Sequence, residues 1–325
     1  MRPLISIIIP MYNVEKFIED CLNSLICQNI EKEIIVIDDG STDHSKQLVE
    51  NYTKQYSYIQ LLSQSNQGQG TARNIGLNLA QGEYIFFCDS DDKIKADTLL
   101  ELYLFCKSND LDILRTGWET FSESGDVKTN LPPSRLDIFD RLLTAREYFE
   151  KTIRAWYNVG PWNGIYKREF LIENNIFFPE KIQFEDNTFS LKLYLSQPLA
   201  RTAFKNISFY RVRLREGSTT SERVKPKKII DQLDNIKLMN EFISKMVLDD
   251  LKGIAKIAVS SLVFTMTAYY YRLEKKAREE IYKIIPKDVL KEAIKYPQSC
   301  FQKYKLILFV YFKPILDLYE KIKGK

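Results

Sequence analysis

Short apolar runs alternate with amphipathic segments in the first part of the chain. The runs are rich in β-branched and aromatic side chains and predict strands over residues 4–9, 33–37, 58–62 and 84–88; those at 4–9, 33–37 and 84–88 are typical of buried strands. Between them, apolar spacing predicts helices, including residues 15–27 and 71–80. This alternation predicts an α/β fold with a mostly parallel sheet flanked by helices.

The pattern is less regular from Ala96 onward. We expect helices from about 96, over 144–155 and 168–174, and from 184, with strands at 111–114 and 203–210. The polar residues 117–140 predict a loop or hairpin, and Gly160 to Gly164 predict a rigid segment.

Beyond Val224 the chain changes to long, periodic segments rich in lysine and leucine. They predict helices over residues 227–245, 249–272, 276–285, 287–295 and from 303. We therefore expect an α/β domain at residues 1–223, with halves at 1–116 and 117–223, and a helical C-terminal region at 224–325. The most apolar window, 254–271, contains Lys256, and 306–312 is far shorter than the roughly 20 residues needed to span a bilayer. We expect no transmembrane helix.

Carboxylates follow two of the predicted strands. Asp38-Asp39 ends the second strand, and Asp89-Ser90-Asp91-Asp92 follows the strand at 84–88. In an open α/β sheet, ligands bind outside the carboxyl ends of the strands, so both groups belong to one active-site edge. A hard divalent cation such as Mg²⁺ or Mn²⁺ would offset the repulsion between the carboxylates. The alternative is a solvated turn that caps the helix starting near Ala96.

Composition narrows the chemistry. The chain has 325 residues and a formal net charge of +4, too mild for a dedicated nucleic-acid binder. The five cysteines are scattered without CxxC pairs, as in reduced cytoplasmic proteins, and we expect no signal peptide. The single histidine, His44, nearly excludes histidine zinc sites and Ser-His-Asp catalysis, and it is expected to face solvent. Acid–base chemistry therefore falls to carboxylates.

Four segments, in this order and spacing, resemble glycosyltransferase family 2. They are Ser6 to Asn13, Glu33 to Asp43, Asn66 to Gly76, and Asp89 to Asp92. The resemblance covers residues 1 to about 220 and leaves out the helical C-terminal region. It implies a GT-A fold, a nucleotide-sugar donor (a UDP-sugar above all), a divalent metal and inversion at the anomeric carbon. The two halves of the α/β domain would bind donor and acceptor, respectively.

The resemblance also implies roles for individual residues. Asp39 would contact the uracil or ribose, Asp91 the metal, and Asp89 the ribose or, as the second DxD carboxylate, the metal. Glu185-Asp186 resembles the family's Glu-Asp pair, in which the aspartate is the catalytic base. The stretch from Tyr210 to Ser218 is similar to the segment that closes over the donor, but Arg211, Arg213 and Arg215 alternate here, so the phosphate-facing arginine stays open. The implied donor-binding residues are Pro10, Tyr12, Asn13, Asp38, Asp39, Gly70, Arg73, Asp89, Ser90, Arg215 and Ser218.

General chemistry agrees with these assignments. The departing nucleoside diphosphate gains negative charge, which a metal ion and arginines stabilise. The attacking hydroxyl must lose a proton, which the carboxylate of Asp186 can accept. Trp162 and Asn163 fit an acceptor site because sugars present apolar faces to aromatic rings; the alternative for Trp162 is plain core.

Three other functions are alternatives to a glycosyltransferase. A dinucleotide-binding dehydrogenase needs GxGxxG after the first strand, where Pro10-Met11-Tyr12 stands instead. A nucleotidyltransferase would share the metal carboxylates, but its glycine- and lysine-rich phosphate loop is missing from that turn. A non-catalytic carbohydrate-binding protein would need neither the metal pair nor a distant base.

The C-terminal segment suggests where the acceptor lies. Lysines flank an aromatic run from Lys303 to Lys313, as in helices that lie in a membrane interface. Enzymes resembling this chain commonly extend polyprenyl-linked precursors of surface polysaccharides at the cytoplasmic leaflet. Peripheral contact with the inner face of the plasma membrane would fit that route. The same residues could instead pack against the domain or form a homodimer. The motifs bind nucleotide and metal, so they leave the sugar, acceptor and linkage undefined.

Overall fold

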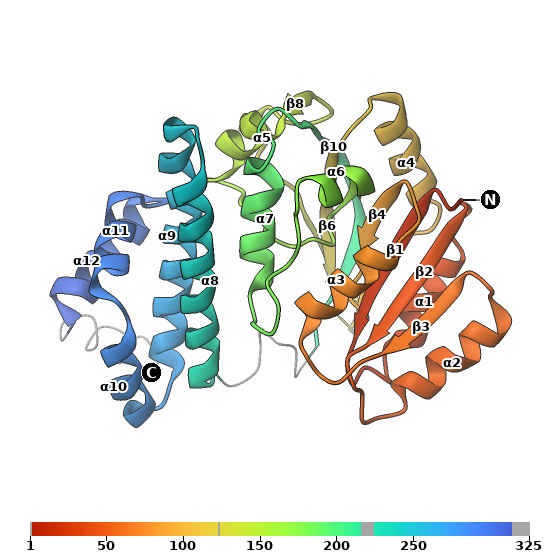
Figure 1. The fold of residues 1–325 in the computed structure, drawn as a ribbon, viewed down its shortest axis with the longest axis horizontal. Helices are drawn as coiled ribbons and strands as arrows, with labels where there is room; N and C mark the ends of the chain where they lie inside the picture. Colours follow the sequence, from red (N-terminus) through yellow and green to blue (C-terminus); the bar gives the residue numbers. More distant parts are fainter. Residues whose placement is uncertain (1, 123, 216–223, 314–325) are drawn as a thin grey trace.

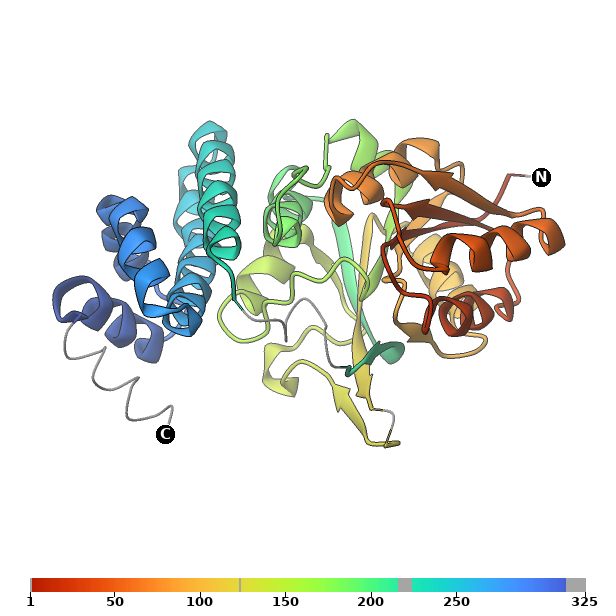
Figure 2. The ribbon, with the colours of Figure 1, turned by 90° about the horizontal axis from the view of Figure 1, so that it is seen from below.

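The protein is an α/β domain beside a helical bundle (Figure 1). The structure, a computed structural model, describes residues 2–122, 124–215 and 224–313. The described strands form one sheet in the order β3-β2-β1-β4-β9-β6-β10-β5. Figure 2 shows the C-terminal helices on one side of the sheet domain and the N-terminus on the opposite side.

The first four strands of the sheet are parallel neighbours. They are β1 (Ile5–Met11), β2 (Lys32–Asp38), β3 (Ile59–Ser63) and β4 (Tyr84–Phe87). Met11 pairs with Asp38 and Ile8 with Phe87, so β2 and β4 end at the same edge on either side of β1. The expected convergence of the two acidic segments is confirmed at the level of topology.

The second half of the sheet mixes strand directions. β9 (Gly164–Lys167) lies antiparallel between β4 and β6 (Ile113–Phe121), whereas β10 (Arg201–Arg213) runs parallel to β6. The short strands β5 (Lys93–Ile94), β7 (Val127–Asn130) and β8 (Leu142–Thr144) also pair antiparallel. The α/β fold flanked by helices is confirmed, but the described sheet is mixed rather than mostly parallel, because five of its nine strand pairings are antiparallel. The sequence did not predict β5, β8 and β9, because such short runs, unlike the wholly apolar β4, mix in polar residues or glycine and show no strand signal.

Helices cover both faces of the sheet. In β1, Ile8 contributes to one apolar core and Ile7 and Ile9 to the other, which explains why the strand is a continuous apolar run. The helices of this domain are α1 (Ile18–Ile26), α2 (Ser45–Gln55), α3 (Gln69–Leu79), α4 (Leu99–Ser108), α5 (Ala145–Thr152), α6 (Arg168–Glu173) and α7 (Glu185–Leu195).

The C-terminal helices continue the core that contains Ile8. They are α8 (Pro226–Lys245), α9 (Asp249–Arg272), α10 (Lys275–Ile284), α11 (Lys287–Lys295) and α12 (Cys300–Tyr311). α12 begins earlier than the sequence pattern indicates, because the side chain of Ser299 accepts a hydrogen bond from the Gln302 backbone N–H and caps the helix. Ile236 of α8 and Val263 of α9 join the same apolar cluster as Phe189 of α7. The bundle is therefore packed onto the α/β domain.

One described helix, α9, is long and apolar enough to cross a bilayer by length and composition. Of the 18-residue stretch of α9 that is most apolar, 56% is buried inside the protein. The helix packs against α8, α11 and α12. The burial shows α9 as the central helix of the bundle.

Candidate active site

The acidic turn after β4 is held in place by β10. The Tyr210 hydroxyl donates to Asp92 Oδ2 (2.9 Å), and the Tyr210 hydroxyl oxygen accepts from the Asp89 backbone N–H (3.0 Å). The Arg213 backbone N–H donates to Asp92 Oδ1 (2.7 Å). Asp92 is buried, and burial together with Asp91 and Asp89 raises its pKa well above the usual range. Asp92 therefore shapes the turn, which leaves Asp89 and Asp91 as the accessible carboxylates.

The carboxylates of Asp89 and Asp91 fit a divalent cation that is also coordinated by a substrate. The side chains of Asp89 and Asp91 stay 29% and 22% exposed. Burial raises the pKa of Asp89, Arg73 opposes the rise, and the charge of Asp91 adds to it, so a cation here would relieve repulsion. No cluster of three or more metal-ligating side chains occurs in the described part of the chain. This pair suits an ion that completes its shell with phosphate oxygens and water, as Mg²⁺ does.

The arginines of β10 and the residues after it have different partners. Arg211 pairs with Glu119 (3.3 Å), and Arg213 donates to Asp20 (2.8 Å) and to the Asp91 carbonyl (3.0 Å). Arg215 Nε donates to the Asp91 carboxylate at 2.7 Å. Of these three arginines, Arg215 is thus the one that donates to the carboxylate of a predicted metal ligand. Ser218, predicted to bind donor, lies outside the described residues.

Arg73 of α3 joins the acidic turn to the second carboxylate pair. Its guanidinium donates to Asp89 Oδ1 (2.7 Å) and to Glu185 Oε1 (2.5 Å), and it lies over the ring of Phe178 (5.3 Å). The side chain is only 2% exposed. Gly70 permits this approach: a Cβ there would lie 2.4 Å from the Pro179 carbonyl oxygen. The acidic turn and the start of α7, which are distant in sequence, therefore meet at the buried guanidinium of Arg73.

The Glu185-Asp186 pair begins α7. Glu185 is fully buried, and desolvation raises its pKa to about 7 against the opposing effect of Arg73. Burial also raises the pKa of Asp186, whose Oδ1 accepts a hydrogen bond from the Asn187 amide (3.0 Å). Arg73 lowers the pKa of Asp186 and the charge of Asp89 raises it. A raised pKa suits a carboxylate that accepts a proton.

Asp39 organises the loop that precedes α3. Its Oδ1 accepts hydrogen bonds from Gln64 Nε2 (2.6 Å) and the Gln67 N–H (2.7 Å), and its Oδ2 accepts one from the Gly68 N–H (2.8 Å). Sequence reasoning missed Gln64 and Gln67; the polar stretch from Ser63 to Gly70 was the available signal. Asp39 therefore links the end of β2 to this loop.

Other predicted donor-binding residues form hydrogen bonds that hold the loops at this edge of the sheet. Asp38 is buried and accepts from the Ser41 N–H (2.9 Å) and from Ser63 Oγ (3.2 Å). Asn13, at a left-handed φ of 50°, accepts from the Thr42 N–H (2.8 Å).

The remaining donor-edge residues are Pro10, Ser90 and Tyr12. Pro10 is buried in β1, paired with Ile37, and Ser90 is buried in the acidic turn. Tyr12, by contrast, is 47% exposed. Among these groups, Tyr12 is the ring available to a ligand.

The predicted acceptor residues lie beside Tyr210. Trp162 stacks on the Tyr210 ring (4.7 Å between centroids) and packs edge-on against Trp118, which in turn contacts Trp156 (5.2 Å). These are the three tryptophans of the chain, and all three are partly exposed. Asn163 is buried, and its Oδ1 has no hydrogen-bond partner in the described part of the protein. Trp162 is thus both part of the packing and adjacent to the acidic turn.

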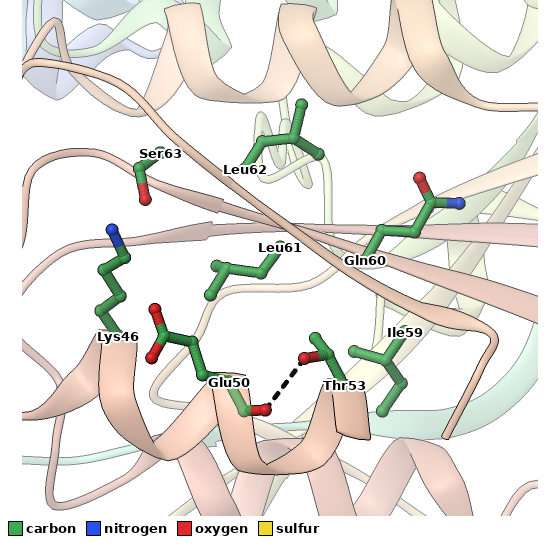
Figure 3. A pocket seen from close by; sticks show the side chains of 8 residues that line it. All are labelled: Lys46, Glu50, Thr53, Ile59, Gln60, Leu61, Leu62 and Ser63. Carbon is green, nitrogen blue, oxygen red and sulfur yellow. Dashed lines mark hydrogen bonds between the residues drawn. The ribbon is translucent and has the colours of Figure 1, made fainter. Parts of the chain in front are cut away.

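A hollow of about 600 Å³ lies elsewhere, between α2 and the edge strand β3 (Figure 3). None of the predicted donor, metal or acceptor residues lines it. Its lining residues are Lys46, Glu50, Thr53, Ile59, Gln60, Leu61, Leu62 and Ser63.

The amino-acid sequence matches a known enzyme family. The profile described as glycosyl transferase family 2 matches residues 6–172, half of the chain. The chain belongs to glycosyltransferase family 2. The family suggested by the sequence motifs is thereby confirmed.

Curated relatives are similar over about two thirds of the chain. Glycosyltransferase EpsJ of Bacillus subtilis is 36% identical over 219 residues, which cover 65% of this chain and 62% of EpsJ. The cholesterol galactosyltransferase of Borreliella burgdorferi is 32% identical over 67% of this chain and 62% of its own length. The chain thus spans 60% to 62% of the first curated relatives that it matches.

Solved structures share the fold. Residues 1–349 of S. aureus TarS, in complex with UDP-GlcNAc, align over 98% of this chain and 89% of TarS with a TM-score of 0.68 and 24% identity. A mannosyltransferase from Pyrobaculum calidifontis, in complex with GDP-Man and Mn²⁺, aligns with a TM-score of 0.56 and 16% identity. At these identities the likeness shows the fold alone, and it confirms the predicted GT-A arrangement with a helical C-terminal region.

Proposed function

We propose that this protein is an inverting glycosyltransferase that moves a sugar from a UDP-sugar to a hydroxyl of a saccharide acceptor. The observation that carries the proposal is the Arg73 bridge, which brings Asp89 of the acidic turn and Glu185 of the α7 pair to one guanidinium. A displacement needs the leaving group and the base at one reacting carbon, and the bridge supports this because it brings the two carboxylate segments together.

Asp186 is the proposed base. Its carboxylate accepts the proton of the acceptor hydroxyl as the oxygen attacks the anomeric carbon, and the bond to the diphosphate oxygen breaks. Glu185 holds Arg73 through the buried ion pair and so keeps positive charge near the reacting carboxylates. A single displacement of this kind inverts the anomeric centre.

Asp89 and Asp91 are the proposed ligands of Mn²⁺ or Mg²⁺. The ion, when bound, supplies positive charge to the diphosphate leaving group. Arg215 pairs with Asp91 in the described structure and can exchange that partner for a phosphate oxygen, since a guanidinium binds both kinds of anion bidentately. Asp39, Tyr12 and Asn13 would line the nucleoside side of the site.

The acceptor would bind beside Trp162. This ring is partly exposed and stacked on Tyr210, whose hydroxyl holds the acidic turn, so a sugar against it would lie next to the donor. Asn163 would contribute through its unpartnered Oδ1. Residues 1–116 would form the donor half, residues 117–223 the acceptor half, and residues 224–325 the helical region.

We further propose that the acceptor is a lipid-linked precursor of a surface polysaccharide at the cytoplasmic face of the membrane. Four large side chains on and just after α12 are 50% to 61% exposed: Phe301, Tyr304, Tyr311 and Phe312. Lys303 lies among them and is exposed too. Exposed aromatic rings with lysines suit an anionic lipid interface. TarS, a relative, is described as a poly(ribitol-phosphate) β-N-acetylglucosaminyltransferase, which supports a surface-polymer route.

A donor screen tests the function. Release of nucleoside diphosphate would be measured for a panel of UDP- and GDP-sugars with Mg²⁺, with Mn²⁺ and with chelator. We expect metal-dependent release from a UDP-sugar and its loss in Asp91→Ala. Release of pyrophosphate from a nucleoside triphosphate would instead indicate a nucleotidyltransferase. Saccharide binding that survives both chelation and Asp91→Ala, without turnover, would indicate a carbohydrate-binding protein.

A further inference from the structure

Asn235 of α8 contacts both ends of the segment that carries Glu185 and Asp186. Its Nδ2 donates to the Gln183 carbonyl (2.7 Å), and its Oδ1 accepts from Thr188 Oγ1 (2.9 Å). The four residues between these two contacts include the proposed base. Asn235 and Thr188 are 0% and 1% exposed, so water does not compete for either hydrogen bond.

The start of α7 needs support from outside its own helix. Phe184, the residue before the helix, has a left-handed φ of 64°, which is rare for a bulky side chain, and it provides no side-chain cap. The chain here would therefore favour other conformations without tertiary contacts. The direction in which the Asp186 side chain leaves the helix depends on this turn.

The C-terminal helices supply that support. Asp231 Oδ2 accepts from the Gln183 N–H (3.3 Å), so α8 binds both the N–H and the carbonyl of Gln183. Tyr269 of α9 lies against the Phe184 ring (5.6 Å between centroids). The packing of α8 along α7 is visible in Figure 1.

We propose that Asn235 is a positioning residue for the catalytic carboxylates, so that the helical C-terminal region is part of the active site. The inference rests on the proposed function, which assigns Asp186 as the base. Asn235 is fully buried and bonded to protein groups, so it acts by fixing the backbone on both sides of residues 184–187. Its loss should slow the chemical step and leave donor binding unchanged.

The chain offers a matched control on the same helix. Gln232 is also fully buried in α8, yet neither its Oε1 nor its Nε2 has a hydrogen-bond partner among the described residues. Gln232→Met therefore removes a buried amide of similar size without removing a hydrogen bond. It controls for the general effect of changing a polar side chain in this interface.

The experiment compares Asn235→Leu, Thr188→Val and Gln232→Met with the wild type, using the UDP-sugar that gives the most diphosphate release. We expect Asn235→Leu to lower kcat about 10- to 100-fold, since a displacement of about 1 Å at a reacting group has effects of that size. Thr188→Val, which removes one of the two bracketing bonds, should lower kcat by a smaller factor. Affinity for the UDP-sugar, measured by calorimetry, should change less than about twofold, and Gln232→Met should keep wild-type kcat.

Folding and function are separated by further readouts. Thermal unfolding is measured for every variant, and if Asn235→Leu does not fold, Thr188→Val decides the question alone. In Asn235→Leu combined with Thr188→Val, the fall in kcat should be less than the product of the single effects, because both remove the same contact. The inference is wrong if kcat is unchanged, or if Gln232→Met loses as much. A wild type without any transfer or donor hydrolysis refutes the proposed function instead.

Discussion

At the residue scale, ionisable groups in this site differ in how far they are withdrawn from water. Asp92 and Glu185 are buried and bonded to protein groups, whereas Asp89 and Asp91 keep part of their surface. Aspartate therefore serves as scaffold at position 92, whereas at positions 89 and 91 it is the metal ligand in our proposal. Of these four carboxylates, Asp89 and Asp91 are the two whose partly exposed oxygens can exchange a protein partner for a substrate.

Asp186→Asn tests the base. We expect kcat to fall about 10²- to 10⁴-fold because the amide cannot accept the proton, while donor affinity stays near wild type. Single-turnover transfer and calorimetric titration of the donor would check this. Asp110→Asn is the control: that carboxylate is 70% exposed and pairs with Lys167 at the surface, so kcat should not change. Wild-type turnover in Asp186→Asn would contradict the assignment.

Glu185 makes stability depend on pH. Its pKa is raised from 4.5 to about 7 by burial, so between these values the folded state retains a proton that the unfolded state has released. Stability contributed by this group therefore falls as pH rises from about 4.5 to 7 and is constant above that. Relative to Glu185→Gln, the wild type should lose on the order of 1 to 3 kcal/mol of unfolding free energy across this window. Urea unfolding of both proteins at pH 5 and pH 8 measures it, and parallel curves would contradict the prediction.

At the element scale, α3 and α7 are joined through one side chain. Arg73 projects from α3 to the turn after β4 and to the first residue of α7, and Gly70 allows the helix to approach. The sequence indicated Arg73 as a donor-binding residue, but its distance along the chain from Glu185 concealed the ion pair. Such pairing depends on which elements the sheet brings together.

Arg73→Met tests this link. The substitution leaves Glu185 buried without its cation, which should destabilise the protein by about 3 kcal/mol. Urea unfolding at pH 8, where Glu185 of the wild type is ionised, measures the change. The double variant with Glu185→Gln should recover part of the loss, because the uncompensated charge is then removed. A double variant as unstable as the sum of both single variants would contradict a direct pair.

At the scale of the whole molecule, the helical region both extends the core and offers a surface. Leu306 and Phe309 of α12 are fully buried, whereas Phe301 and Tyr304 on the same helix are about 60% exposed. The buried pair secures the helix to the bundle. The exposed pair is available to a lipid surface or to a second copy of the chain.

Phe301→Gln combined with Tyr304→Gln tests membrane contact without disturbing the buried face. We expect binding to phosphatidylglycerol vesicles in co-sedimentation to fall roughly tenfold, since each aromatic ring contributes part of its burial free energy at the interface. Leu199→Gln, at a site that is 74% exposed in the α/β domain, should bind as the wild type does. Unchanged binding in the double variant would contradict the proposal, and a change in oligomeric state would favour a dimer interface.

The sequence by itself determined the first four strands, the longer helices and the acidic strand ends, because their patterns are local and periodic. It also carried the family motifs. The tertiary structure decided the antiparallel strands, which are too short to show a period. It decided the role of Asp92, the partners of each arginine and the support of α7 by Asn235, because these are contacts between distant segments. Local pattern specifies an element, whereas packing alone selects which side chains meet.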